Sequence, residues 1–353
     1  MPTAGVLSAG RGIRHVYIYN ECAPKKRGGA GMADKPKVVI TRRLPGVSLA
    51  KIGEKALALY PDRDGPMPRR ELLRKVRGAV GILCTLEDRI DAALMDAAGD
   101  SLRVVSNFAV GVNNIDIPEA TRRKIRVCNT PDVLTEATAD AGFALMLAAA
   151  RRFSEAERFL RAGKFTAWDP WGFLGVPVFG RTLGIVGMGK IGGAIAARAR
   201  GFEMQVLYHD RNRLPKDREA ALRARYAGLD DLLSGSDFVV ISVPLSPETR
   251  GMIDRNRLRK MKKEAVLVNI ARGGIVDEAA LAEALAEGWI FATGLDVYEK
   301  EPKVHPRLLR AAGAVLLPHV GSATTQAREG MGKLATENLL AVLSGDDPPC
   351  PVN

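Results

Sequence analysis

Three glycines and one acidic residue form the first pattern in the sequence that could bind a ligand. Gly187, Gly189 and Gly192 lie in the run Leu-Gly-Ile-Val-Gly-Met-Gly-Lys-Ile-Gly, which ends an apolar segment and opens the Ala-rich segment 194–200. In a strand, turn and helix of this kind, the glycines permit a tight turn, an approach of backbone N–H groups to a pyrophosphate, and close helix packing. Asp210 follows the next apolar run, near the spacing of about 20 residues expected for an acid that binds a ribose hydroxyl. The pattern predicts a dinucleotide site.

Polar residues follow three later strand-like segments. Arg272 comes after 265–269, Asp296 and Glu301 come after 291–295, and His319 comes after 315–317. Ligands of doubly wound sheets bind beyond the carboxyl ends of the strands, so we expect these side chains near a nicotinamide. The other three histidines are His15, His209 and His305, and His319 alone follows a strand at this edge.

These side chains have complementary chemistry. Hydride transfer at an alcohol or carbonyl carbon needs a group that exchanges a proton near working pH, and the imidazole of His319 fits. A carboxylate beside the imidazole favours its charged form, which gives Glu301 a role. The guanidinium of Arg272 offers paired donors to a substrate carboxylate or carbonyl. The set predicts an oxidoreductase acting on a small anionic substrate.

Two series of alternating strands and helices would position these residues. The first series has predicted strands at 38–40, 79–83, 102–106 and 125–128, with helices at 68–76 and 91–98. The second has predicted strands at 183–187, 204–208, 238–243, 265–269, 291–295 and 315–317, with a clear helix at 277–287. Such alternation is typical of parallel α/β sheets, and the second series matches a doubly wound nucleotide-binding sheet.

The connection between the series has its own pattern. The Ala-rich and Leu-rich run at 135–161 predicts one unusually long helix capped by Thr135. The segment 168–180 is rich in Trp, Pro and Gly, so we expect irregular structure there. Residues 323–344 predict a final amphipathic helix.

Length and composition agree with a globular enzyme of about two domains. The chain has 353 residues, of which 46% are hydrophobic and 26% charged. Its net charge of +12 includes +4 in residues 1–31, and the remaining basic residues are scattered among acids, which suits small anions at least as well as nucleic acid. The longest apolar stretch, 141–150, is half the length that crosses a bilayer. We therefore expect neither a nucleic-acid nor a membrane partner.

Cysteine usage and the N-terminal segment complete the compositional picture. The four cysteines are far apart and show neither metal-ligand spacing nor a disulfide framework, which favours a cytoplasmic protein without a metal site. Residues 1–31 are dominated by glycine, proline and basic residues and lack a secretory apolar core, which predicts a disordered extension or an over-long start.

The combined motifs resemble those of the D-isomer-specific 2-hydroxyacid dehydrogenases, especially the glyoxylate/hydroxypyruvate reductase and D-glycerate dehydrogenase branch. The likeness runs from about Val38 to the end of the chain and includes the segments 110–116, 129–136 and 243–249 besides those already described. It implies reduction of glyoxylate or hydroxypyruvate to glycolate or D-glycerate with NAD(P)H, in a homodimer. It also implies a Rossmann cofactor domain (131–321) and a flavodoxin-like outer domain formed by both chain ends (33–130 and 322–353), after a disordered extension (1–32).

Site roles follow from the same resemblance. It makes His319 the acid/base, Glu301 its partner and Arg272 the substrate anchor, and it places Val110 and Gly111 where backbone amides hold the substrate carboxylate. The implied cofactor-binding residues are Thr138, Gly187, Met188, Gly189, Lys190, Ile191, Gly192, Asp210, Arg211, Asn212, Val243, Pro244, Thr249, Ile270, Ala271, Arg272, Asp296, His319 and Gly321. No metal is implied.

The sequence leaves alternatives open for the cofactor, NAD or NADP, and for the substrate. Asp210 should repel a 2′-phosphate and favour NAD, whereas Arg211 and Arg213 are of the type that accommodates NADP. The segment 83–86 lacks the arginines that phosphoglycerate dehydrogenases present, which favours a small unphosphorylated acid. Another D-2-hydroxyacid, such as lactate or a bulkier one, is a second hypothesis. A dinucleotide-sensing binding protein like the corepressors of this fold is a third.

Two positions depart from the family pattern. Asn113 stands where many relatives have Asp, which leaves the anchoring backbone intact but changes the hydrogen bonds of its loop. Trp171 lies one place from a Trp seen in some reductases of this branch. It would either reach a neighbouring active site or pack at the dimer contact.

Overall fold

The computed structural model describes residues 35–63 and 65–353. The predicted extension over residues 1–32 lies outside the described residues. Within the described part, no helix is both long and apolar enough to cross a membrane.

The second series of strands forms a parallel seven-stranded sheet. Its strands are β6 (Thr182–Val186), β7 (Gln205–His209), β8 (Ala224–Tyr226), β9 (Phe238–Ile241), β10 (Val266–Asn269), β11 (Ala292–Leu295) and β12 (Ala314–Leu316), in the order β12-β11-β10-β9-β6-β7-β8. The chain runs outward from β6 to β8 and then crosses to β9 on the other side, which is the doubly wound order of a dinucleotide-binding sheet. This confirms the predicted fold class. The edge strand β8 was missed, because its three residues Ala-Arg-Tyr form no apolar run.

The first series forms a parallel five-stranded sheet. Its strands are β1 (Lys37–Ile40), β2 (Leu57–Leu59), β3 (Ala79–Cys84), β4 (Val104–Asn107) and β5 (Arg126–Cys128), in the order β2-β1-β3-β4-β5. This is the flavodoxin-like order that the resemblance implies. The edge strand β2 was also missed, since it is only three residues long and half-exposed.

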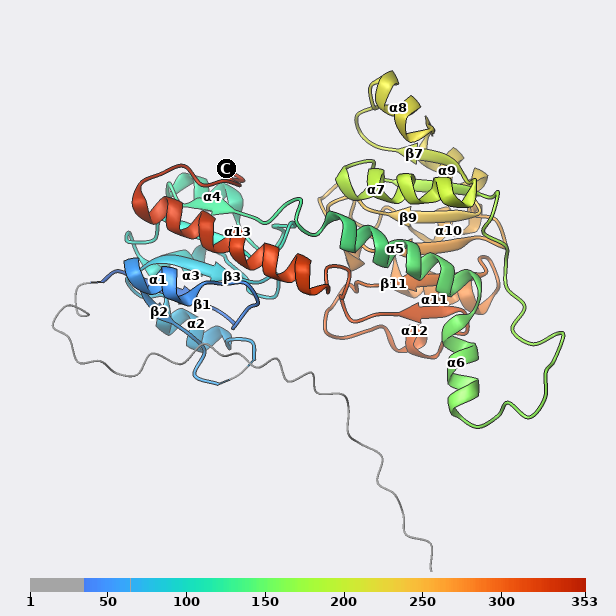
Figure 1. Ribbon diagram of the computed structural model, residues 1–353, viewed down its shortest axis with the longest axis horizontal. Coiled ribbons are helices and arrows are strands. Elements are labelled where there is room, and N and C mark those ends of the chain that lie inside the picture. The colour runs from blue at the N-terminus through green and yellow to red at the C-terminus, as the bar shows by residue number, and fades with distance from the viewer. Residues whose placement is uncertain (1–34, 64) are drawn as a thin grey trace, which may run out of the picture. The chain divides into compact units, whose positions relative to one another are not determined.

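Helices cover both faces of each sheet (Figure 1). On the seven-stranded sheet, α5 (Thr135–Ala150) and α7 (Lys190–Ala199) pack on one face, and α9 (Leu229–Gly235), α10 (Arg255–Lys260), α11 (Glu278–Ala286) and α12 (Pro306–Arg310) on the other. On the five-stranded sheet, α1 (Leu49–Lys55) and α13 (Thr325–Ser344) pack on one face, and α2 (Arg69–Lys75), α3 (Ala92–Ala98) and α4 (Ile117–Arg122) on the other. Because both faces are covered, the strands read as continuous apolar runs.

The remaining helical elements are α6 (Phe153–Arg161), α8 (Lys216–Leu222) and the two 3₁₀ turns at Arg200–Phe202 and Gly273–Ile275. Residues 168–180 contain neither helix nor strand, as predicted.

The prediction of one long helix over 135–161 was wrong. The chain forms α5 and α6 instead, separated at Arg151 and Arg152. Arg152 adopts a left-handed conformation (φ 52°), and its guanidinium donates to Glu155 at 2.7 Å. Thr135 is also not the cap, because the cap position of α5 is Leu134, which makes no side-chain hydrogen bond. Sequence periodicity continues through this break, so periodicity alone did not reveal it.

The final helix returns to the five-stranded sheet. Helix α13 is capped by Thr324, which accepts from the Ala327 N–H at 3.1 Å, and it ends at Gly345 in a left-handed conformation. Gly332 lets this helix lie directly against the chain after β1, since an added Cβ there would collide with the backbone of residues 45–47.

We predict that Gly332→Ala lowers the free energy of unfolding by about 1–3 kcal/mol, because the backbone it meets cannot move aside cheaply. Gly53→Ala is the matched control, since its Cβ meets nothing within 4 Å and alanine favours helix α1 by about 0.5–1 kcal/mol. Guanidinium denaturation of both variants measures the difference. Equal midpoints for the two variants would contradict the close approach.

Candidate functional site

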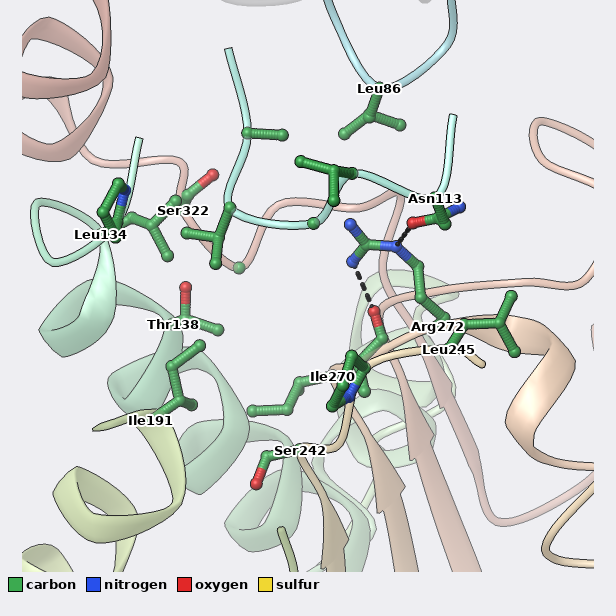
Figure 2. Close-up of a pocket in the computed structure, with 18 of the residues that line it drawn as sticks. Leu86, Asn113, Leu134, Thr138, Ile191, Ser242, Leu245, Ile270, Arg272 and Ser322 are labelled. Atoms are coloured by element: carbon green, nitrogen blue, oxygen red, sulfur yellow. Dashed lines mark hydrogen bonds between the residues drawn. The ribbon is translucent and has the colours of Figure 1, made fainter. Parts of the chain in front are cut away.

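A cavity of about 810 Å³ lies at the carboxyl ends of both sets of strands. Loops that follow β6, β9, β10, β11 and β12 contribute to its wall, as do residues 108–113 after β4 and Leu86 after β3. Figure 2 shows Thr138 and Ile191 on one side of this cavity and Arg272 with Asn113 on another. The predicted site residues that line it are Val110, Gly111, Thr138, Gly189, Lys190, Ile191, Val243, Pro244, Ile270, Ala271, Arg272, Asp296, His319 and Gly321.

The glycine turn has the shape of a phosphate cradle. Gly187 ends β6 with φ 98°, and an added Cβ would lie 2.7 Å from the Val243 side chain after β9. Gly192 has no room for a Cβ because the carbonyl oxygen of Gly187 occupies that place. At Gly189, the cap position of α7, a Cβ would meet nothing within 4 Å. Open space in front of the helix N-terminus, where backbone N–H groups are unpaired, fits a pyrophosphate.

This turn sits where the strand order reverses, between β6 and β9. A dinucleotide binds at that crevice in doubly wound sheets. A second, smaller hollow beside the turn is lined by Met188, Gly189, Lys190 and Arg218, among others. The residues present therefore fit a dinucleotide.

Asp210 lies at the end of β7 and is held in place by the turn. Its Oδ2 accepts from the Met188 N–H at 2.8 Å. Arg211 and Asn212 follow it and are exposed, and neither lines the described cavities. Arg213 is engaged by Glu219, which accepts from it at 2.9 Å. Of the two arginines that would suit a 2′-phosphate, Arg213 is thus already paired with an acid.

Thr249 supports the cavity wall from behind. It is buried, its hydroxyl donates to the Pro244 carbonyl at 2.7 Å, and it accepts from the Ser246 N–H at 2.8 Å. The structure therefore places Thr249 under the turn that carries Val243 and Pro244, outside the cavity itself.

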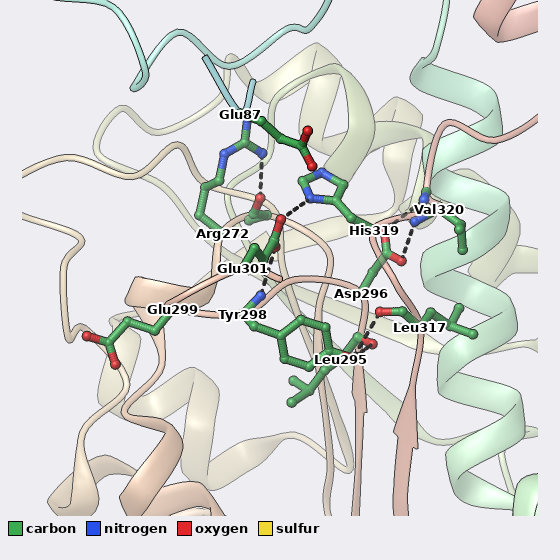
Figure 3. A network of polar contacts seen from close by, with 12 residues as sticks. Glu87, Arg272, Leu295, Asp296, Tyr298, Glu299, Glu301, Leu317, His319 and Val320 are labelled. Carbon is green, nitrogen blue, oxygen red and sulfur yellow. Dashed lines mark hydrogen bonds and ion pairs between the residues drawn. The ribbon is translucent and has the colours of Figure 1, made fainter. Parts of the chain in front are cut away.

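His319 and Glu301 are in direct contact (Figure 3). The Nδ1 atom of His319 lies 2.8 Å from Oε2 of Glu301, and the Tyr298 N–H donates to Oε1 of the same carboxylate at 2.9 Å. Burial raises the pKa of Glu301, but the hydrogen bond and charge of His319 outweigh it and leave the pKa below its usual value. Glu301 does not line the cavity, whereas His319 does, so the imidazole stands between the carboxylate and the cavity.

Asp296 fixes the turn that carries His319. Its buried carboxylate accepts from the Val320 and Gly321 N–H groups, both at 2.7 Å, and its carbonyl accepts from the His319 N–H at 2.9 Å. His319 itself has φ 55°, a conformation that costs a non-glycine residue free energy and persists only where its surroundings hold it. Burial raises the pKa of Asp296, and the two N–H donors oppose that rise.

Arg272 reaches from the end of β10 to the loop after β4. Its Nε donates to the Asn113 side-chain oxygen at 3.0 Å, and its Nη1 donates to the Ala271 carbonyl at 2.7 Å. A Cβ added to Gly111 would collide with Nη2 of Arg272, so this atom lies directly against Gly111. Burial lowers the pKa of Arg272, and the charge of Glu301 opposes this. The guanidinium thus lies beside the backbone amides of the 110–111 loop.

A partly buried polar network holds that loop. Asn107 at the end of β4 donates to the Gly111 carbonyl at 2.9 Å, and Asn129 donates to the Val110 carbonyl at 2.9 Å. Asn114 donates to the Thr85 carbonyl at 3.1 Å, which ties the loop to the end of β3. None of these three asparagines was predicted as a site residue, although Asn114 and Asn129 lie in the segments 110–116 and 129–136 that carry the family resemblance.

Other cavity residues were also missed by the sequence analysis. They include Leu86, Asn113 as a partner of Arg272, Ser322, Arg328 and Met331. Arg328 and Met331 lie three residues apart on α13, so a helical projection of the segment after His319 could have placed them on one face.

The arrangement brings together an acid/base pair and a half-buried cation at one cavity. A carboxylate-backed imidazole can give or take a proton, and a guanidinium beside backbone amides can hold a carboxylate. Together with the dinucleotide cradle, they can carry out reduction or oxidation at a carbon next to a carboxylate.

Comparison with known proteins agrees with this chemistry. Residues 143–321 match the "D-isomer specific 2-hydroxyacid dehydrogenase, NAD binding domain" family. The chain is 51% identical to a glyoxylate reductase of Thermococcus kodakarensis over 324 residues, covering 90% of this chain and 96% of the relative. It is 48% identical to a glyoxylate reductase of Pyrococcus horikoshii, with the same coverages.

Solved structures give the same result. A Thermus thermophilus protein superimposes with a TM-score of 0.83 at 46% identity, covering 90% of this chain and 100% of that one. An NADPH-dependent glyoxylate/hydroxypyruvate reductase of Sinorhizobium meliloti, in complex with NADP and malonate, superimposes with a TM-score of 0.81 at 33% identity, covering 90% and 97%. The seven-stranded sheet is the NAD-binding part, and the chain belongs to the D-isomer specific 2-hydroxyacid dehydrogenase family.

Proposed function

We propose that the protein reduces small 2-oxo acids, with glyoxylate and hydroxypyruvate as substrates and glycolate and D-glycerate as products. One observation carries this proposal: His319, backed by Glu301 at 2.8 Å, lines the same cavity as the half-buried guanidinium of Arg272. The names of the similar proteins, which are glyoxylate reductases, support the choice of substrate.

The chain's own residues define the pose of the substrate. The Nη2 of Arg272 and the amides of Val110 and Gly111 would hold the C1 carboxylate. The side chain of Asn113 is neutral, so it orients Arg272 without cancelling the charge that attracts the carboxylate. This pose directs the C2 carbonyl oxygen toward the imidazole.

His319 would donate the proton to the C2 oxygen. Because its Nδ1 is engaged by Glu301, Nε2 is the atom free to face the substrate. When bound on the glycine turn, a reduced nicotinamide supplies the hydride to C2. Glu301 keeps the imidazole oriented and stabilises its charged form, while Asp296 holds the turn on which His319 stands.

The remaining cofactor-binding assignments stay part of the proposal. Met188, Gly189 and Lys190 would contact the phosphates, and Asp210 would accept from a ribose hydroxyl. The carboxylate of Asp210 and the pairing of Arg213 with Glu219 both favour NADH over NADPH.

The test is a panel of 2-oxo acids assayed with NADH and NADPH. We expect turnover of glyoxylate and hydroxypyruvate, with a higher kcat/KM for NADH, and we expect Asp210→Ser to reduce that preference because a repelling charge is removed. Lys333→Met, on the exposed side of α13, is the control. A strong NADPH preference in the unmodified chain would show that Asp210 does not repel the 2′-phosphate.

Two outcomes of the same panel would overturn the function. Turnover confined to pyruvate or bulkier acids would favour a different D-2-hydroxyacid dehydrogenase. Binding of NADH without reduction of any 2-oxo acid would favour the dinucleotide-sensing alternative.

We further infer a cytoplasmic homodimer whose contact includes an apolar surface around α6. This surface consists of Phe153, Leu160, Phe165, Trp168, Trp171, Leu174 and Phe179, all exposed. Helix α6 buries none of its residues, and Phe173 packs against Phe159, which ties the following segment to the helix. Large exposed apolar side chains concentrated in one segment, here residues 153–179, are typical of an interface between proteins. Trp171, 78% exposed, would pack within that contact.

Sedimentation velocity tests the dimer. We expect twice the chain mass of 38.0 kDa, and we expect Leu160→Asp to shift the protein toward monomer by placing a charge in the contact. Leu309→Asp is the matched control, because Leu309 is equally exposed, at 62% against 60%, but lies on α12. Identical sedimentation of both variants would remove this surface from the contact.

A further inference from the structure

Arg328 is a cation on the cavity wall with no role in the reaction described above. It lies at the end of the first turn of α13, nine residues after His319, and it lines the cavity together with Met331. Residues three apart on a helix share a face, so this face of α13 is turned toward the cavity. Ser322 and Leu86 line the cavity as well.

The guanidinium of Arg328 has no acid partner among residues 35–63 and 65–353. The charges that act on it are Asp296, which is favourable, and Arg42, which is unfavourable. Both carboxylate oxygens of Asp296 already accept N–H groups, from Val320 and Gly321. Arg42 is itself paired with Glu87 at 3.4 Å. Burial accordingly lowers the pKa of Arg328.

A half-buried cation without a partner is costly unless something else in the site compensates it. The C1 carboxylate of a substrate would not do so, because Arg272 and the Gly111 loop already provide its anchor. The two guanidiniums also stand on different parts of the wall, since Arg272 is held at Asn113 and Ala271 whereas Arg328 projects from α13. The group left to meet Arg328 is the substituent on the other side of the C2 carbonyl.

We propose that Arg328 is a specificity-determining residue that binds an oxygen-bearing substituent on C2 of the 2-oxo acid. A hydroxymethyl or carboxymethyl group would accept from its N–H groups, whereas the hydrogen of glyoxylate and the methyl of pyruvate offer no acceptor. Arg328 thereby favours hydroxylated and dicarboxylic 2-oxo acids. This inference rests on the proposed function.

The experiment measures kcat/KM of the full chain for glyoxylate, pyruvate, hydroxypyruvate and oxaloacetate, before and after Arg328→Met. We expect the ratio of hydroxypyruvate to pyruvate to fall about 10-fold and the ratio of oxaloacetate to pyruvate to fall further, up to about 100-fold, as charge-assisted hydrogen bonds are lost. Arg328→Lys keeps the positive charge but loses the paired donors of the guanidinium. Its ratios should therefore lie between those of the unmodified chain and those of Arg328→Met.

Lys333→Met removes an exposed cation from the same helix and should change none of the ratios, which controls for the general attraction of anions. If Arg328→Met leaves the ratios between the acids unchanged, whether or not kcat/KM itself falls, the assignment of Arg328 is overturned and the proposed function stays intact. Failure of the unmodified chain to reduce any of them would overturn both. Turnover of pyruvate by the variant reports that its site is assembled.

Discussion

The contact between Nδ1 of His319 and Oε2 of Glu301, at 2.8 Å, is the interaction on which the rest of the site depends. The two residues come from different strand ends, after β12 and after β11, so the contact exists only because parallel strands bring their carboxyl ends to one edge. Two further links keep these strand ends in register. Asp296 accepts hydrogen bonds from three backbone N–H groups of the His319 turn, two at its carboxylate and one at its carbonyl. The Tyr298 hydroxyl donates to the Leu317 carbonyl at 2.9 Å. The pair is therefore built into the sheet edge, which lets a residue with an unfavourable backbone conformation hold a fixed orientation.

Charge in the cavity is arranged so that it remains available to a substrate. Arg272 is oriented by two neutral acceptors, the Asn113 side chain and the Ala271 carbonyl, and the acid that acts on it, Glu301, is engaged by His319. A carboxylate in place of Asn113 would pair directly with the guanidinium. The neutral amide is the departure from the family pattern noted in the sequence, and its effect in the structure is to orient the cation without neutralising it. Partial burial of this cation is unfavourable by itself, and a bound carboxylate would offset that cost.

Much of the fold and of the site could be predicted because it depends on local patterns. The glycine turn and the residues just after β10, β11 and β12 follow from strand periodicity and from the rule that ligands bind at the carboxyl edge. The short edge strands β2 and β8 could not be found, because each has only three residues and neither forms an apolar run with a periodic signal. The break at Arg152 depends on one left-handed residue stabilised by Glu155, which no apolar pattern reveals. Asn107 reaches the site only through tertiary contacts, so nothing in the sequence distinguished it from other asparagines. A helical projection places Arg328 and Met331 on one face of α13, but only the packing of α13 shows that this face is turned toward the cavity.

The kcat of Glu301→Gln, compared with that of the unmodified chain, tests the central claim most directly. Because the pKa of Glu301 is lowered, its side chain remains a charged carboxylate beside Nδ1 of His319. Glutamine keeps the shape and removes the charge. The account predicts that kcat falls about 10-fold or more, because the imidazole loses the carboxylate that orients it and supports its role as proton donor, with little change in the KM of the 2-oxo acid, which Arg272 anchors. An unchanged kcat would contradict it.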